Sequence, residues 1–473
     1  MVTYTLDAHS AIPLYEQLYR AIRADIASGV LTPETRMPSR RKLAAHLRVS
    51  AATIDNAYEQ LTAEGYIYAL PRRGYFVSRV QSLGLFPPRA DAGGRGPGAL
   101  PEQAEARPVY DLRTQGADTQ HFPFSIWARL MREVLSEQHT ALLESTHSQG
   151  VLALREQICA YLHDFRGVRA QPEQVVVGAG SEYLTGLLLQ LLGRERVYAI
   201  EEPGYYKLRS IYENNGARIA HVPLDEQGLS PDALRQSGAQ AVHVTPSHQF
   251  PTGLTMTVGR RMELLEWAAE AEERVIIEDD YDSEFRFAGR PVPAMQSLDA
   301  RGQVIYLNTF ARSLAPSLRI SYMVLPERYL ARYREWMRYY ACTVPGFEQY
   351  ALSKFMARGY LERHIARMRA VYKARRDALV AAIEQQHLGE ALSAGAGLHL
   401  LLRTEDARDA QELARLAEAA GVAITPLHRY FAEGTPAWAS RMLVLGFAGL
   451  DEARLREAAC RLTQAWRKAD EAR

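Results

Sequence analysis

The chain has 473 residues, and 47% of them are hydrophobic, which is ordinary for a globular protein that folds in water. This length exceeds what one typical core uses, so we expect two or more domains. We see no apolar run long enough to span a membrane and no basic-then-apolar secretory signal. The three cysteines are odd in number and far apart, which indicates neither a disulfide framework nor a metal site. We therefore expect a cytoplasmic protein.

Charge is unevenly distributed although the net charge is only +1. Residues 1–80 carry ten Lys and Arg against seven Asp and Glu, a balance of +3, and the remainder carries 46 against 48. A basic N-terminal segment has the sign expected of a module that binds DNA. The chain holds only five lysines beside 51 arginines, so an arginine at an unusual position has an arginine-rich background.

The first 80 residues predict short helices followed by a hairpin. Four apolar side chains recur at helical spacing and form one face of a first helix: Leu14, Leu18, Ile22 and Ile26. Ser39 is the expected N-cap of a second helix, and Ser50 that of a third helix that Gly65 ends. Two strands, at 66–68 and 75–77, enclose a basic turn. Helices, a tight turn and a basic hairpin are the layout of a winged helix-turn-helix.

This segment contains several short motifs: Met37-Pro38-Ser39-Arg40, Leu43-Ala44, Val49-Ser50, Ala57-Tyr58, Leu61, Glu64-Gly65-Tyr66 and Gly74-Tyr75-Phe76-Val77. Together they resemble the GntR family of DNA-binding regulators. The resemblance implies that the third helix enters the major groove while the hairpin touches the backbone or minor groove. The implied contact residues are Ser39, Arg40, Arg41, Ser50, Thr53, Arg72 and Arg73. Ala51-Ala52 replaces the arginine that the family often has after Ser50, so base reading depends more on Arg40, Arg41 and Thr53. The alternative is a helical bundle with a solvated basic face.

Residues 81–107 are rich in Gly and Pro and predict a linker. Residues 108–473 alternate short β-branched runs with amphipathic helical patterns. The runs are 175–177, 197–200, 241–244, 275–277 and 304–307. Near-continuous apolar runs of this kind predict a mostly parallel sheet buried on both faces, and the fold class is α/β.

Five motifs follow these runs: Gly178-Ala179-Gly180-Ser181-Glu182, Glu201-Glu202-Pro203-Gly204-Tyr205, Thr245-Pro246-Ser247-His248-Gln249-Phe250-Pro251-Thr252-Gly253, Ile277-Glu278-Asp279-Asp280-Tyr281 and Thr309-Phe310-Ala311-Arg312. Together they resemble the motifs of fold-type I aminotransferases, which use pyridoxal phosphate. The string through His248-Gln249 is typical of the MocR/GabR regulators, a GntR-type reader fused to an aminotransferase-like domain. The expected architecture is a winged helix-turn-helix (1–80), a linker (81–107) and a transferase-like domain (108–473), with a small C-terminal α+β part.

The resemblance implies a role for individual residues. Asp279 would bond the pyridinium nitrogen of the cofactor, Tyr281 its phenolic oxygen, and Tyr205 would contact its ring. Ser181, Thr309 and Arg319 would hold the phosphate. Two further arginines compete for the carboxylate of an amino-acid effector, Arg441 and Arg429, unless both lie on the surface.

One position departs from the pattern. Where the resemblance expects the lysine that forms a Schiff base, the chain has Arg312, which keeps its proton and offers no neutral amine. Three interpretations stay open. In the first, pyridoxal phosphate binds without a covalent bond, and Arg312 pairs with the phosphate or an effector. In the second, Lys207 supplies a substitute amine, and in the third, the site is a relic and the domain only dimerises. An introduced arginine at this position would be a fourth explanation.

Classical transamination needs the lysine both as imine partner and as base, so we expect none. We expect a homodimeric regulator that binds double-stranded DNA and a small amino-acid-type effector. The alternative function is an active aminotransferase that uses Lys207.

Overall fold

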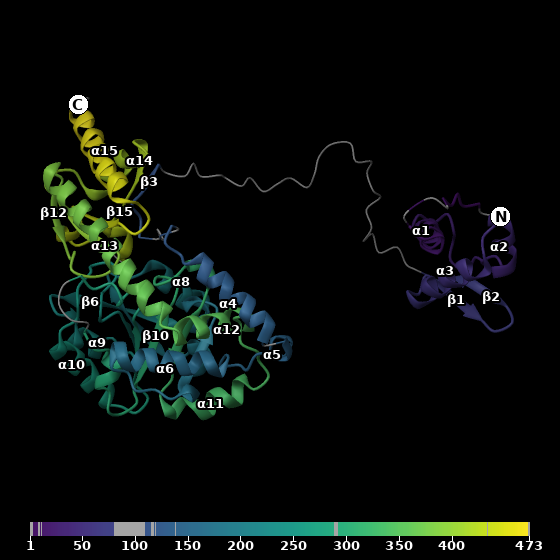
Figure 1. The fold of residues 1–473 in the computed structure, drawn as a ribbon, viewed down its shortest axis with the longest axis horizontal. Coiled ribbons are helices and arrows are strands. Elements are labelled where there is room, and N and C mark those ends of the chain that lie inside the picture. The colour runs from purple at the N-terminus through teal and green to yellow at the C-terminus, as the bar shows by residue number, and fades with distance from the viewer. Residues whose placement is uncertain are drawn as a thin grey trace. The chain divides into compact units, whose positions relative to one another are not determined.

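The computed structural model describes residues 3–7, 10, 12–79, 109–114, 118, 120–137, 139–287, 292–432 and 434–471. The chain divides into two compact units, residues 1–105 and 106–473 (Figure 1). The predicted linker, 81–107, lies outside the described residues.

The first unit is a three-helix core with a hairpin. Its elements are α1 (Leu14–Ala27), α2 (Arg40–Leu47), α3 (Ala51–Ala63), β1 (Ile67–Leu70) and β2 (Gly74–Val77). The predicted caps are confirmed, because Ser39 accepts a bond from the Lys42 amide (3.4 Å) and Ser50 one from the Thr53 amide (3.2 Å). The hairpin strands are antiparallel. Leu18, a residue of the predicted apolar face, is fully buried at the centre.

The second unit is built on an eight-stranded sheet. Its strands are β4 (Val175–Gly178), β5 (Val197–Glu202), β6 (Arg218–Asp225), β7 (Gly228–Leu229), β8 (Ala241–Val244), β9 (Val275–Asp279), β10 (Val304–Thr309) and β11 (Ser321–Val324). Their order across the sheet is β4-β11-β10-β9-β8-β5-β6-β7. The five predicted strands are all present and run parallel to one another. Three strands were not predicted. β6 runs parallel to β5, whereas β11 and β7 run antiparallel to their neighbours.

Both faces of this sheet are covered by helices, as the β-branched runs predict. The helices are α4 (Phe124–Glu137), α5 (His139–Leu143), α6 (Leu152–Arg166), α7 (Ser181–Leu192), α8 (Tyr206–Asn214), α9 (Pro231–Gln236), α10 (Val258–Ala269), α11 (Glu327–Met337) and α12 (Gly346–Ala357). In β4, Val175 and Val177 pack with α4, α6 and α12, which lie together in Figure 1. Val176 points to the opposite face and packs with α7 and α11. Alternate side chains of one strand thus pack into two separate hydrophobic cores.

A smaller C-terminal part follows the long helix α13 (Tyr360–Gln385). It contains β12 (Gly389–Leu392), β13 (His399–Thr404), β15 (Thr425–Pro426) and β16 (Met442–Gly446), in the antiparallel order β12-β13-β16-β15. Helix α15 (Glu452–Glu471) packs against α13, and α14 (Ala410–Ala419) packs against α15 (Figure 1). The start of the unit joins this part, because β3 (Tyr110–Asp111) pairs with β14 (Val422–Ala423).

Short 3-10 turns complete the unit: η1 (Pro172–Gln174), η2 (Met295–Leu298), η3 (Pro316–Leu318), η4 (Leu427–Tyr430) and η5 (Ala437–Ala439). No helix in the part of the chain that the structure describes is both long and apolar enough to cross a membrane.

Candidate functional site

A cavity of about 250 Å³ lies at the carboxyl ends of the parallel strands. Residues at or just after the ends of β4, β5, β8, β9 and β10 line the cavity, because parallel strands all end at the same edge of the sheet. Eight of the ten predicted cofactor and effector residues line it: Ser181, Tyr205, Lys207, Asp279, Tyr281, Thr309, Arg312 and Arg319. Five strand ends, far apart in sequence, therefore contribute to one site.

One end of the cavity combines a helix N-terminus with an arginine. Gly180 precedes α7 with φ +102°, and a Cβ at this position would lie 2.4 Å from Nη2 of Arg319. Arg319 donates to the carbonyl of Ala179 (3.1 Å) and pairs with Glu182 (3.0 Å). Thr309 accepts a bond from the hydroxyl of Ser321 (2.8 Å) at the adjoining strand ends. Free helix amides beside a guanidinium suit a phosphate.

Another part of the cavity wall is acidic. Asp279 is the last residue of β9, and its carboxylate lies 3.5 Å from Nε2 of His243 on the neighbouring strand β8. The other ring nitrogen of His243 is bonded to the hydroxyl of Tyr212 (2.9 Å), and both side chains are buried. His243 thus lies behind Asp279, although its Nε2 makes no hydrogen bond within the described residues. A carboxylate in the cavity wall suits the positively charged ring nitrogen of a ligand. His243 and Tyr212 were not predicted as functional residues, because nothing in the sequence of a buried strand or helix marks them as partners of Asp279.

Aromatic side chains form a third wall around Phe250. Its ring centre lies 5.2 Å from those of Tyr205 and Tyr430 and 5.1 Å from that of His399. Burial raises the pKa of Tyr205 to about 12, and the charge of Arg312 opposes the rise. A flat aromatic ligand therefore has edge and face contacts available on this wall.

A second acid, which the sequence analysis did not single out, also lines the cavity. The buried Oε2 of Glu201 accepts bonds from the Thr245 hydroxyl (2.6 Å) and the Gln249 amide (3.2 Å). Its Oε1 has no hydrogen-bond partner among the described residues. Burial raises the pKa of this carboxyl to about 7, despite the bonds that favour its ionised form.

Two cations in the cavity wall are not neutralised. Arg312 donates from Nη1 to the carbonyl of Thr114 (3.0 Å), and Lys207 lies in the first turn of α8. Within the described ranges, no ion pair joins either side chain to a carboxylate. The cavity therefore has positive charge available to an anionic ligand.

The structure does not bring the two remaining arginines to the cavity. Arg429 lies in η4 and Arg441 just before β16; both are exposed, and neither lines the wall. The backbone of Arg441 is fixed by the Thr404 amide, which bonds its carbonyl (3.1 Å). A motif gives a position along the chain, but strand pairing decides where the side chain points.

The predicted DNA-contact residues of the first unit lie at the starts of α2 and α3 and in the turn between β1 and β2. Thr53 is half-buried, and the other six are exposed: Ser39, Arg40, Arg41, Ser50, Arg72 and Arg73. Arg40 pairs with Asp55 (2.9 Å) and lies 5.7 Å from the ring centre of Tyr75. Arg40 is thus held between α3 and the hairpin.

Comparison with known proteins accounts for both units. Residues 115–462 match the family described as aminotransferase class I and II, and residues 14–77 match the bacterial regulatory proteins of the gntR family. The chain is 38% identical over 472 residues to the HTH-type transcriptional regulator YdeL of Bacillus subtilis (strain 168), covering 98% of this chain and 99% of that protein. It is 34% identical over 465 residues to the probable rhizopine catabolism regulatory protein MocR of Rhizobium meliloti, covering 96% and 93%.

Among solved structures, the kynurenine aminotransferase of Pyrococcus horikoshii in complex with PMP superposes with a TM-score of 0.69 and 26% identity. The match covers 77% of this chain and 92% of that chain. The fold and the cavity thus define a two-part protein, in which a GntR-type helix-turn-helix domain precedes an aminotransferase-fold domain.

The chain belongs to the MocR-type family of HTH-type transcriptional regulators. The predicted fold class is confirmed, and the regulator is favoured over the alternative of an active aminotransferase. The GntR-type domain implies that DNA is a partner.

Proposed function

We propose that this regulator binds pyridoxal 5′-phosphate without a covalent bond and senses an amino-acid-type effector in the same cavity, without turnover. The observation that carries the proposal is Arg312 in the cavity wall, at the position where the aminotransferase pattern has its lysine. A guanidinium keeps its proton and cannot attack an aldehyde. The cavity wall otherwise retains the residue types that suit this cofactor.

The described residues fit pyridoxal phosphate. Asp279 with His243 behind it offers a carboxylate to a ring nitrogen, and Tyr205 offers an aromatic contact. Gly180 leaves the amides of α7 open beside Arg319, which suits a dianionic phosphate. Ser181 and Thr309 add hydroxyls at that end, and Tyr281 would meet the phenolic oxygen. When bound, the cofactor supplies an electron-withdrawing ring and a reactive aldehyde.

The effector would be recognised through its carboxylate. Arg312 and Lys207 both line the cavity and have no carboxylate partner within the described ranges. Within the described residues, Arg312 uses one of its five guanidinium donors, on Thr114, so a planar carboxylate can still bond it in two places. An anionic amino acid is therefore the ligand class that this wall favours.

Regulation would follow from linkage in a homodimer. We assign residues 1–80 to DNA binding, 81–107 to a linker and 108–473 to effector binding and dimerisation. An effector that binds one arrangement of the dimer more tightly shifts the population of that arrangement. Because coupling is reciprocal, DNA then changes effector affinity by the same factor.

An absorption titration with pyridoxal phosphate, followed by borohydride reduction and peptide mapping, tests the proposal. We expect saturable binding with no adduct at Lys207 or elsewhere, and no product in an assay with an amino acid and a 2-oxo acid. An adduct trapped on Lys207 with turnover would instead establish the enzyme. Absence of binding would leave a DNA-binding dimer on an inactive scaffold.

A further inference from the structure

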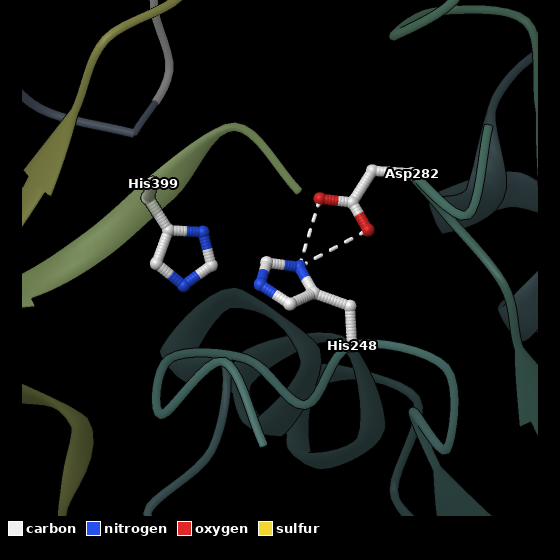
Figure 2. A group of neighbouring side chains, drawn as sticks. All are labelled: His248, Asp282 and His399. Atoms are coloured by element: carbon white, nitrogen blue, oxygen red, sulfur yellow. Dashed lines mark hydrogen bonds and ion pairs between the residues drawn. The ribbon is translucent and has the colours of Figure 1, made fainter. Parts of the chain in front are cut away.

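A buried chain of hydrogen bonds leads from the cavity wall into the protein. The hydroxyl of Tyr281 lies 3.1 Å from Nδ1 of His248, and this nitrogen lies 3.0 and 3.2 Å from the two carboxylate oxygens of Asp282. His248 and Asp282 are each 2% exposed. Figure 2 shows the Nδ1 side of His248 facing Asp282, with the ring of His399 on the other side. None of the roles assigned above uses His248 or Asp282.

The carboxylate decides which nitrogen of His248 carries the proton. An unprotonated Nδ1 would direct its lone pair at two carboxylate oxygens, whereas Nδ1–H donates to them. Nδ1–H then also faces the oxygen of Tyr281, which can only accept from it. The proton of the Tyr281 hydroxyl is not used by His248, so it is free to donate to an atom in the cavity.

The C-terminal part holds this arrangement in place. His399, on β13, packs its ring 4.7 Å from that of His248 and bonds the carbonyl of Pro251 through Nε2 (3.0 Å). Burial lowers the pKa of His399 well below its ordinary value, so its ring is neutral. Gly397 lies against the pair: a Cβ at this position would be 1.8 Å from Cε1 of His248 and 2.7 Å from Asp282.

His248, Asp282 and His399 are also residue types that bind metal ions, and their ligand atoms lie within 4.8 Å of one another. The close packing favours hydrogen bonding over a metal ion. The carboxylate of Asp282 and Nδ1 of His248 already satisfy each other at 3.0 Å, and the backbone of Gly397 fills the adjoining space.

We propose that His248 and Asp282 are positioning residues that fix the Tyr281 hydroxyl as a hydrogen-bond donor to an oxyanion of the ligand in the cavity. This inference rests on the proposed function, in which that oxyanion is the phenolic oxygen of pyridoxal phosphate. His248 and Asp282 act through Tyr281 and do not touch the ligand themselves.

The tautomer of His248 is tested in the protein without added ligand. An imidazole N–H bonded to a buried carboxylate gives a proton resonance far downfield of the backbone amides. We expect such a resonance in the wild type and in Tyr281→Phe, its loss in His248→Asn, and an upfield shift in Asp282→Asn. A wild type without this resonance would overturn the inference, whatever the ligand.

A double-mutant cycle tests the role of the pair. We expect His248→Leu and Tyr281→Phe each to weaken binding of pyridoxal phosphate about tenfold, and the double variant to lose no more than either single variant. His248→Asn places an amide N–H near the original Nδ1 and should restore most of the affinity. Unfolding curves for all variants establish that each one is folded.

The outcomes separate this inference from the function on which it rests. If the wild type binds pyridoxal phosphate but the two substitutions weaken binding additively, the inference about His248 is overturned and the proposed function stands. If the wild type binds no pyridoxal phosphate, the cofactor part of the proposed function is overturned and the inference falls with it. One equivalent of Zn²⁺ retained after gel filtration, and lost in His399→Ala, would also overturn it, because the cluster would then be a metal site.

Discussion

Nη1 of Arg312 donates a 3.0 Å hydrogen bond to the carbonyl oxygen of Thr114, which is 198 positions earlier in the chain. Thr114 follows β3, whose pairing with β14 brings the beginning of the second unit to the cavity. The bond fixes the guanidinium through a neutral backbone atom, and no carboxylate of the described residues pairs with its charge. A cation held in this way is prepared for an anionic ligand.

Replacing Arg312 with lysine should restore a covalent link to pyridoxal phosphate. The lysine amine can lose its proton and attack the aldehyde, while the remainder of the wall is unchanged. Borohydride reduction and peptide mapping should then trap the cofactor at position 312 in Arg312→Lys but not in the wild type. Arg312→Met, which has no amine, is the matched control. An adduct on Lys207 in all three proteins would contradict the assignment.

Asp279→Asn should weaken binding of pyridoxal phosphate by about 10- to 100-fold, because a hydrogen bond to a charged group contributes about 1.5–3 kcal/mol. The amide keeps the size of the side chain but removes the negative charge that we propose to face the ring nitrogen. Equilibrium titration of absorbance measures the change. Asp232→Asn, at a largely exposed position, controls for loss of one negative charge. Equal affinities in the two variants would show that Asp279 does not contact the cofactor.

Glu201→Gln should alter how stability depends on pH. The pKa of Glu201 is raised from 4.5 to about 7, so between these values the folded chain holds a proton that the unfolded chain has lost. The stability that Glu201 contributes therefore falls as pH rises from about 4.5 to about 7. Glutamine cannot ionise, so at pH 8 the free energy of unfolding of the variant should exceed that of the wild type by up to about 3 kcal/mol.

Urea unfolding at pH 5 and pH 8 measures this difference. Glu226→Gln, in the exposed turn between β6 and β7, serves as the control. Other buried carboxyls with raised pKa values, such as Glu278, titrate in both proteins and cancel in the comparison. If Glu201→Gln and the wild type lose the same stability between the two pH values, Glu201 is already ionised at pH 5.

Gly397→Ala should destabilise the protein by about 2–4 kcal/mol, through a left-handed backbone and a steric overlap. Gly397 has φ +71°, and its Cβ would overlap the ring of His248. Gly395→Ala is a matched control two residues away, because nothing lies within 4 Å of its Cβ position. Thermal unfolding of both variants gives the comparison. Equal unfolding temperatures of the two variants would mean that the residues around His248 are packed loosely enough to accommodate a Cβ at position 397.

Arg40→Ala should weaken binding to the operator by about 1–3 kcal/mol if the arginine reads a base. Asp55 and Tyr75 hold Arg40 between α3 and the hairpin, so its guanidinium has a defined direction. Gel-shift titration at fixed salt measures the affinity, because phosphate contacts depend on salt. Arg20→Ala, on the exposed side of α1, controls for net charge. Unchanged affinity in Arg40→Ala would exclude a base contact.

Local features of the chain were sufficient to predict much of the fold. Ser39 and Ser50 cap their helices because a side-chain oxygen needs only an amide three residues away. The run 175–177 gave a doubly buried strand because alternate valines face two cores. The antiparallel strand β11 was missed, since its direction depends on the partner it meets and not on its own composition.

The sequence by itself determined the two units and the order of the parallel strands' motifs, and its resemblance to fold-type I aminotransferases predicted the eight side chains that meet in the cavity. These motifs lie together because the strand ends of a parallel sheet converge at one edge. Only the tertiary structure decided what surrounds them. Contacts between segments far apart in the sequence position Thr114, Glu201 and the His248–Asp282 pair. Arg429 and Arg441, which motif position favoured, lie outside the cavity wall. Such contacts depend on strand pairing and side-chain direction, and no local pattern of residues encodes these.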